Sequence, residues 1–73
     1  LKFDITRSAE VDISIYDLTG RKVSDVVNNT EYIQGSHAIR INGFTENMDP
    51  GYYYIRVKAG KDTKTVRLIK LDK

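Results

Sequence analysis

Side chains that commonly carry out catalysis or hold metal ions are sparse in this sequence. It has one histidine, His37, and no cysteine. A zinc site with thiolate ligands and a cysteine nucleophile are therefore both excluded. The carboxylates, among them Asp4, Asp12 and Asp17, are scattered and lack the D-x-D-x-D-G spacing of a calcium-binding loop. There is also no glycine-rich phosphate loop. We therefore expect no catalytic residues, no metal site and no cofactor.

The tyrosines offer a different chemistry, which is stacking. Tyr52 and Tyr54 lie two residues apart and would share one face of an extended strand, with Arg56 continuing the row. Aromatic rings on a surface bind sugar rings, and rings interleaved with cations stack on bases. Tyrosines are also ordinary strand formers. Glycan contact by Tyr52, Tyr54 and Arg56 is therefore an alternative to a purely structural role.

These side chains must be positioned by strands, because alternation of apolar and polar residues dominates the sequence. In residues 11–23, Val11, Ile13 and Ile15 alternate with polar residues, and residues 17–20 then have the composition of a turn. The extended pattern restarts at residue 21. This predicts a hairpin with one buried face, around which the rest of the fold is organised.

Further strands are expected on both sides of this hairpin. They comprise residues 1–5, a bulged strand over residues 23–27 followed by a turn at 28–30, a strand through residues 37–41, a strand over 52–57, and a last strand over 63–71. Residues 43–50 are predicted to be a loop with Phe44 and Met48 turned inward, and residues 58–62 a hairpin loop. In the last strand the apolar positions switch from Val66 and Leu68 to Ile69 and Leu71, which indicates a bulge or burial on both faces.

Six or seven short strands without helical periodicity predict an all-β fold, a small Ig-like β-sandwich of antiparallel strands, with a small barrel as the alternative. The predicted core contains Phe3, Ile13, Ile15, Ile39, Tyr53, Ile55 and Val57. The 73 residues form one domain near the lower size limit for independent folding. Because the chain opens directly in strand alternation, we expect residues 1–73 to be a monomeric domain excised from a larger protein.

Charge is distributed unevenly along the chain. Residues 1–50 hold five Lys and Arg against eight Asp and Glu, whereas residues 51–73 hold seven against two. A basic C-terminal third suits an anionic partner, such as lipopolysaccharide, nucleic acid or an acidic protein surface. The other interpretation is that Lys and Arg protect an edge strand from pairing with another chain.

Several motifs resemble a known family when they are taken in order. VDISIYDLTGRKV is similar to the signature of type IX secretion system C-terminal sorting domains, which end exported proteins of Bacteroidota. Gly35-Ser36-His37 resembles the opening of the family's middle strand, residues 48–53 resemble its "l-x-x-G-x-Y" motif, and residues 66–71 resemble its terminal strand. The Ig-like domain of flagellar hook-capping proteins has a similar pattern.

The resemblance implies a non-catalytic domain that directs an exported cargo across the outer membrane. Its implied partners are the outer-membrane secretion machinery, a sortase-like peptidase and an N-terminal cargo domain of the same protein. The resemblance implies no nucleic-acid partner. The implied location is the periplasm in transit, then the cell surface or medium. The implied recognition residues are Val66, Arg67, Leu68, Ile69, Lys70, Leu71, Asp72 and Lys73. The alternative is a carbohydrate-binding or spacer module of a secreted multidomain hydrolase.

Overall fold

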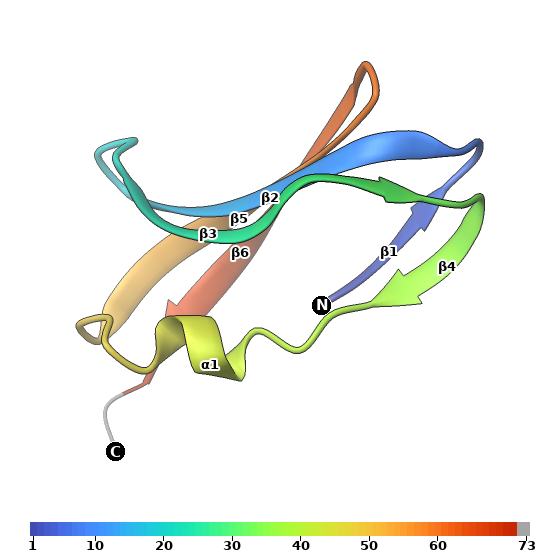
Figure 1. Ribbon diagram of the computed structural model, residues 1–73. Coiled ribbons are helices and arrows are strands. Elements are labelled where there is room, and N and C mark those ends of the chain that lie inside the picture. The colour runs from blue at the N-terminus through green and yellow to red at the C-terminus, as the bar shows by residue number, and fades with distance from the viewer. Residues whose placement is uncertain (72–73) are drawn as a thin grey trace.

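The computed structural model describes residues 1–71, which form two antiparallel sheets and one short helix (Figure 1). The elements are β1 (Lys2–Ile5), β2 (Ala9–Asp17), β3 (Lys22–Tyr32), β4 (Gly35–Ala38), α1 (Asn42–Thr45), β5 (Gly51–Ala59) and β6 (Asp62–Lys70). The larger sheet has the order β3-β2-β5-β6, and the smaller sheet pairs β1 with β4. This confirms the prediction of a small all-β sandwich.

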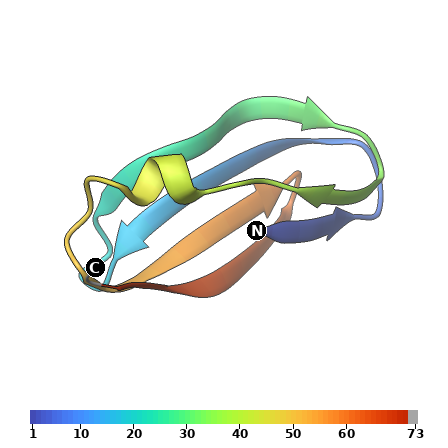
Figure 2. The same ribbon diagram turned by 90° about the horizontal axis from the view of Figure 1, so that it is seen from below.

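The core lies between the two sheets. β1, β4 and α1 form a layer on one face of the four-stranded sheet (Figure 2). The larger sheet contributes buried β-branched residues from its central strands β2 and β5, and β1 contributes the rest. The buried hydrophobic residues are Phe3, Ile5, Val11, Ile13, Ile15, Ile55 and Val57. Of the predicted core, Ile39 and Tyr53 are instead half-buried and pack against this cluster.

The predicted central hairpin is present as β2 and β3, and its second strand is irregular. The pairing register shifts between Val11 and Ile13 and again further along β2, in agreement with the predicted bulge. The predicted turn at residues 28–30 is wrong, because these residues lie within β3. Asn29 has a positive φ of 44°, and its backbone N–H donates to Asp12 Oδ1 at 2.8 Å. The polar Asn-Asn-Thr segment therefore marks an irregularity inside a strand that continues to Tyr32.

The segment between the second half of β3 and β5 differs from the prediction in two places. β4 ends at Ala38, so the predicted strand through residue 41 is shorter, although the N–H of Ile39 still donates to the carbonyl of Leu1. The predicted loop over residues 43–50 contains α1. Met48 packs against the core as expected, whereas Phe44 is 40% exposed.

The last hairpin is tighter and more regular than predicted. Ala59 pairs with Asp62, so the connection consists of Gly60 and Lys61 alone. Pairing then continues without a register shift to Gly51 and Lys70, which contradicts the predicted bulge. Ile69 and Leu71 are 51% and 73% exposed, so burial on both faces is also wrong. Strict alternation places Ile69 on the outer face of the sheet, which no other layer covers in residues 1–71.

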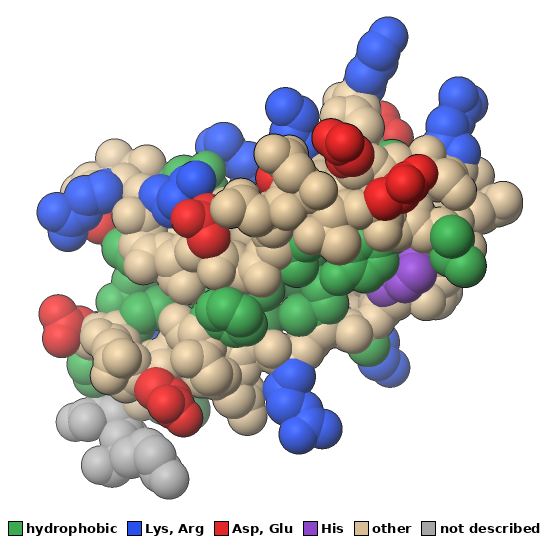
Figure 3. All heavy atoms as spheres, in the orientation of Figure 1, with side chains coloured by type: hydrophobic (Ala, Val, Ile, Leu, Met, Phe, Trp, Pro, Cys, Tyr) green, Lys and Arg blue, Asp and Glu red, His purple; other side chains and the backbone are tan. Residues whose placement is uncertain are grey.

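Apolar side chains also reach the surface between the layers. Figure 3 shows a band of hydrophobic side chains along the middle of the molecule. It reflects a core that includes half-buried residues such as Val26, Val27 and Ile41. Over residues 1–71, the single short helix falls far below the length and apolar content needed to cross a bilayer.

Candidate functional site

β6 forms one edge of the four-stranded sheet, and this edge is regular. All nine of its residues pair with β5, and no strand among residues 1–71 pairs with its other side. The opposite edge, β3, carries register shifts and the positive φ of Asn29. A straight edge accepts an added strand far more readily than a bulged one. The predicted edge strand bearing Lys64, Arg67 and Lys70 is therefore present, and its edge is the better template for pairing.

The structure divides the predicted recognition residues between two faces of β6. Val66, Leu68 and Lys70 lie in the row opposite Ile55, Tyr53 and Gly51, and all three are half-buried. Arg67 and Ile69 lie in the outer row and are exposed, and Leu71 follows the strand. Asp72 and Lys73 lie outside the described residues.

Tyr52, Tyr54 and Arg56 share the outer face of β5, as their spacing predicts. Tyr16 lies opposite Tyr54 in the β2–β5 register, and the two rings stack with centroids 5.6 Å apart and planes 15° apart. The Arg56 guanidinium carbon lies 4.6 Å from the centroid of the Tyr16 ring, a cation–π distance. Arg56 therefore supports the tyrosine pair, and the exposed ring of the row is that of Tyr52.

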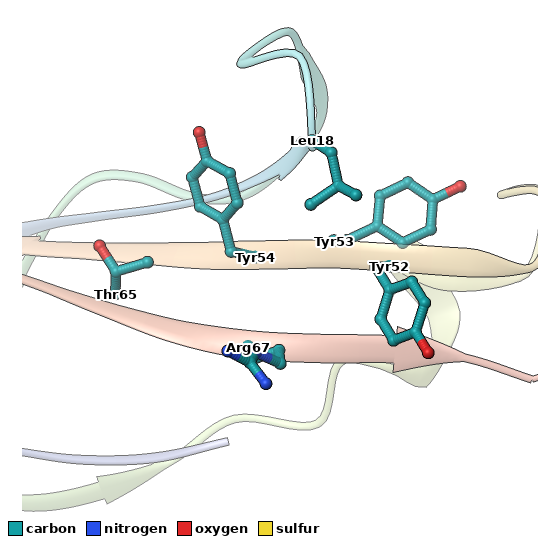
Figure 4. A pocket seen from close by; sticks show the side chains of 6 residues that line it. All are labelled: Leu18, Tyr52, Tyr53, Tyr54, Thr65 and Arg67. Carbon is teal, nitrogen blue, oxygen red and sulfur yellow. The ribbon is translucent and has the colours of Figure 1, made fainter.

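An open hollow of about 550 Å³ lies beside Tyr52 and Tyr54 (Figure 4). Its lining residues come from the beginning of β5, the middle of β6 and the β2–β3 turn. They are Leu18, Tyr52, Tyr53, Tyr54, Thr65 and Arg67. Sequence analysis assigned Tyr52 and Tyr54 to a surface but did not include Leu18. The available signal was a large aliphatic residue in an otherwise polar turn.

Asp17 fixes the turn that presents Leu18. Its Oδ1 accepts hydrogen bonds from the Thr19 hydroxyl at 2.6 Å, from the Thr19 N–H at 3.0 Å and from the Arg21 N–H at 3.0 Å. The Gly20 N–H donates to the Asp17 carbonyl, and Gly20 has a φ of 92° that favours glycine. The bond from the Thr19 side chain and that from the Arg21 backbone lower the pKa of Asp17. The turn is therefore held by a carboxylate that stays ionised.

Charges on the outer face are paired over β2 and β3 but not over β5 and β6. Lys22 Nζ lies 3.0 Å from Asp25 Oδ1, and this contact raises the pKa of Lys22 and lowers the pKa of Asp25. Across residues 1–71, no ion pair involves the cations of the β5–β6 outer face, which are Arg56, Lys58 and Arg67. The face is consequently positive around Arg56 and Arg67, whereas Lys58 lies opposite Asp12 in the β2–β5 register.

His37 lies in an aromatic cluster away from this face. Its Nε2 is 2.7 Å from the Ile33 carbonyl oxygen, and its ring centroid is 4.9 Å from that of Tyr32. Over residues 1–71, no three His, Cys, Asp or Glu side chains gather as metal ligands would. These contacts give His37 a packing role.

Comparison with known proteins extends over nearly the whole chain. Residues 1–71 match a family model described as "Secretion system C-terminal sorting domain". Neither the curated proteins nor the solved structures contain a match. Domains of this family act as sorting signals and are in general non-catalytic. The sequence motifs, the six-stranded sandwich and the family match agree: the chain belongs to the C-terminal sorting domains of the type IX secretion system.

Proposed function

We propose that this domain directs an N-terminally attached cargo from the periplasm across the outer membrane, and that the edge of β6 is what the export machinery binds. Family membership supports the sorting role. The observation that carries the proposed binding mode is the uninterrupted pairing of β6 along one side only. The domain itself performs no chemistry, and a sortase-like peptidase acts on the exported protein.

Strand addition would make use of the folded state of the domain. A receptor strand that pairs with β6 gains backbone hydrogen bonds, and side chains pointing away from the sheet then determine specificity. β5 holds β6 extended along its full length, and half-buried Val66 and Leu68 anchor it to the core. An unfolded C-terminal peptide would lose conformational entropy on binding that the folded domain has already lost.

The test is export of a periplasm-targeted reporter that carries the domain at its C-terminus in a type IX-competent cell. We expect the reporter at the surface or in the medium. The variant Lys70→Glu/Lys73→Glu should reduce export at an unchanged unfolding temperature, because it reverses charge at the end of the recognition strand. Lys2→Glu/Arg40→Glu, which changes the net charge equally but outside β6 and its turn, is the matched control.

Deletion of residues 68–73 is a weaker test, because Leu68 also packs against the core. A reporter that stays in the periplasm with the intact domain would contradict the proposed function. Equal loss of export in the two charge variants would contradict the assignment to β6.

A further inference from the structure

Three large apolar side chains lie exposed together on the outer face of the four-stranded sheet. Leu18 is 71% exposed, Tyr52 59% and Ile69 51%. Tyr52 and Ile69 are direct partners in the β5–β6 register, so their side chains are neighbours. Leu18 lines the same hollow as Tyr52, and Figure 4 shows it above the strand that carries the tyrosines. Clustered apolar exposure of this kind marks an interaction surface, unlike scattered single residues.

The surroundings of these residues are held in place without a ligand. The bonds accepted by Asp17 fix the turn that carries Leu18. The stack of Tyr16 on Tyr54 holds the ring beside Tyr52. A surface ordered in advance loses little conformational entropy when a partner binds.

The charge of this face selects the kind of partner. Arg67 lies opposite Tyr54 and lines the hollow. Arg56 extends the positive charge along β5, and Lys58 beyond it lies opposite Asp12 of β2. Tyrosine and arginine around an apolar centre are the composition of the residues that dominate protein–protein binding energy. A partner with an apolar side chain flanked by carboxylates would be complementary to this surface.

A glycan fits the hollow less well. Its lining contains no Asp, Glu, Asn or Gln side chain, so sugar hydroxyl groups would find Thr65 and the tyrosine hydroxyls as the main side-chain acceptors. Leu18 and Ile69 add aliphatic surface that has no role in ring stacking. The composition therefore favours a protein partner.

We propose that Leu18, Tyr52, Ile69 and Arg67, here called the apolar patch, dock a protein of the export machinery. An apolar side chain of that protein would enter the hollow between Leu18 and Tyr52, and a carboxylate would pair with Arg67. This inference rests on the proposed sorting function. It adds a contact on the β2–β3 turn and the outer face to the contact along the edge of β6.

The decisive experiment uses the same reporter with Leu18→Ser and Tyr52→Ser, separately and together. The matched control is Ile33→Ser, because Ile33 is 72% exposed and lies after β3, outside the apolar patch. We expect each patch variant to reduce the exported fraction about tenfold, as truncation of an interface anchor does to affinity, and the control to leave it unchanged. The unfolding temperatures of the variants must equal that of the wild type, so that a loss of export does not reflect a loss of folding.

Arg67 is tested by charge. Arg67→Glu should reduce export more than Arg67→Lys, whereas Arg40→Glu, which lies beyond β4, should have no effect. If Leu18→Ser misfolds, Leu18→Thr keeps a side chain of branched shape and removes apolar area. Loss of export in a folded Leu18→Thr variant would support the inference as well as loss in Leu18→Ser would.

The outcomes separate the two proposals. Normal export of the patch variants alongside an exported wild-type reporter would overturn the apolar patch and leave the sorting function standing. No export of the wild-type reporter would overturn both. Gel retardation of the wild-type domain by alginate or a neutral glucan, lost in Tyr52→Ser while export of that variant is normal, would overturn the protein partner in favour of a glycan.

Discussion

At the scale of single residues, Asp17 links stability to the surface proposed for binding. Its carboxylate accepts bonds from Thr19 and Arg21, and the turn they close carries Leu18. The carboxylate also lies 3.4 Å from the Arg21 guanidinium. These contacts favour the ionised form and lower the pKa of Asp17 below its ordinary value of 3.8. The side chain that gives the family motif its Asp thus fixes the geometry of the turn.

Asp17→Asn tests this role through pH. A carboxyl group with a lowered pKa in the folded state stabilises the fold above its unfolded pKa, and this stabilisation is lost as the pH falls through the folded value. We expect Asp17→Asn to unfold at a lower temperature than wild type at neutral pH, with the difference in unfolding temperature narrowing as the pH falls through the lowered pKa of the folded state. Thermal unfolding followed by circular dichroism across a pH series gives the unfolding temperatures of the wild type and of the variant. Glu46→Gln, which neutralises an exposed carboxylate outside the turn, is the control. A difference in unfolding temperature between wild type and Asp17→Asn that does not vary with pH would contradict the prediction.

At the scale of elements, the β5–β6 hairpin fixes the position of β6, the strand proposed for recognition. Gly60 has a φ of 61°, while Lys61 is not among the residues with positive φ. Glycine at the first position of a two-residue turn is typical of type II′ hairpins, which match the twist of the strands. The Gly60 N–H also donates to the Glu10 carbonyl at 3.1 Å, which ties the turn to β2. The short turn therefore fixes the register that puts Arg67 and Ile69 outward.

Gly60→Ala should destabilise the domain by about 1–2 kcal/mol because of the positive φ. Steric contact adds little, since a Cβ at this position would meet the Ala9 Cβ at 3.6 Å, an ordinary contact distance. Lys61→Ala in the same turn should change the free energy of unfolding by less than about 0.5 kcal/mol. Chemical denaturation measures both variants. Equal effects would show that the turn does not require glycine at residue 60.

At the scale of the molecule, stability depends on contact between two sheets of unequal size. The smaller sheet has only β1 and β4, too little to be stable alone. Phe3 of β1 is buried, and its ring meets that of Tyr32 on β3 edge-to-face with centroids 5.6 Å apart. The layers therefore stabilise each other, and the domain should unfold as one unit.

Phe3→Ala should cost about 3–5 kcal/mol, the usual range for a buried phenylalanine. A domain of 73 residues has a total stability of roughly 4–11 kcal/mol, so most of it would be lost. Phe44→Ala is the matched control, since Phe44 is 40% exposed and its loss should cost much less. Thermal unfolding followed by far-ultraviolet circular dichroism and by tyrosine fluorescence should give one shared transition. Two separate transitions would mean that the layers fold independently.

Much of the fold follows from local sequence alone. Alternation of Val11, Ile13 and Ile15 determined a strand with one buried face, and the spacing of Tyr52 and Tyr54 placed both rings on one side of another. The Asp17–Gly20 turn was equally evident, because its chemistry depends on neighbours within four residues. The ordered motifs likewise identified the family. The strand patterns and the turn are local properties, and the order of the motifs is a property of the linear sequence, so none of them requires knowledge of the tertiary contacts.

Only the tertiary structure decided which strand is an edge, which apolar residues have a covering layer and which side chains meet. Ile69 looked like core by type, yet the smaller sheet does not extend over the outer face, and it remains exposed. Asn28-Asn29-Thr30 has turn composition, but pairing with β2 keeps it in a strand. Leu18 and Arg67 are 49 positions apart and share a hollow only because antiparallel pairing brings the end of β2, β5 and β6 together. Long-range pairing determines these contacts, and no local pattern encodes it.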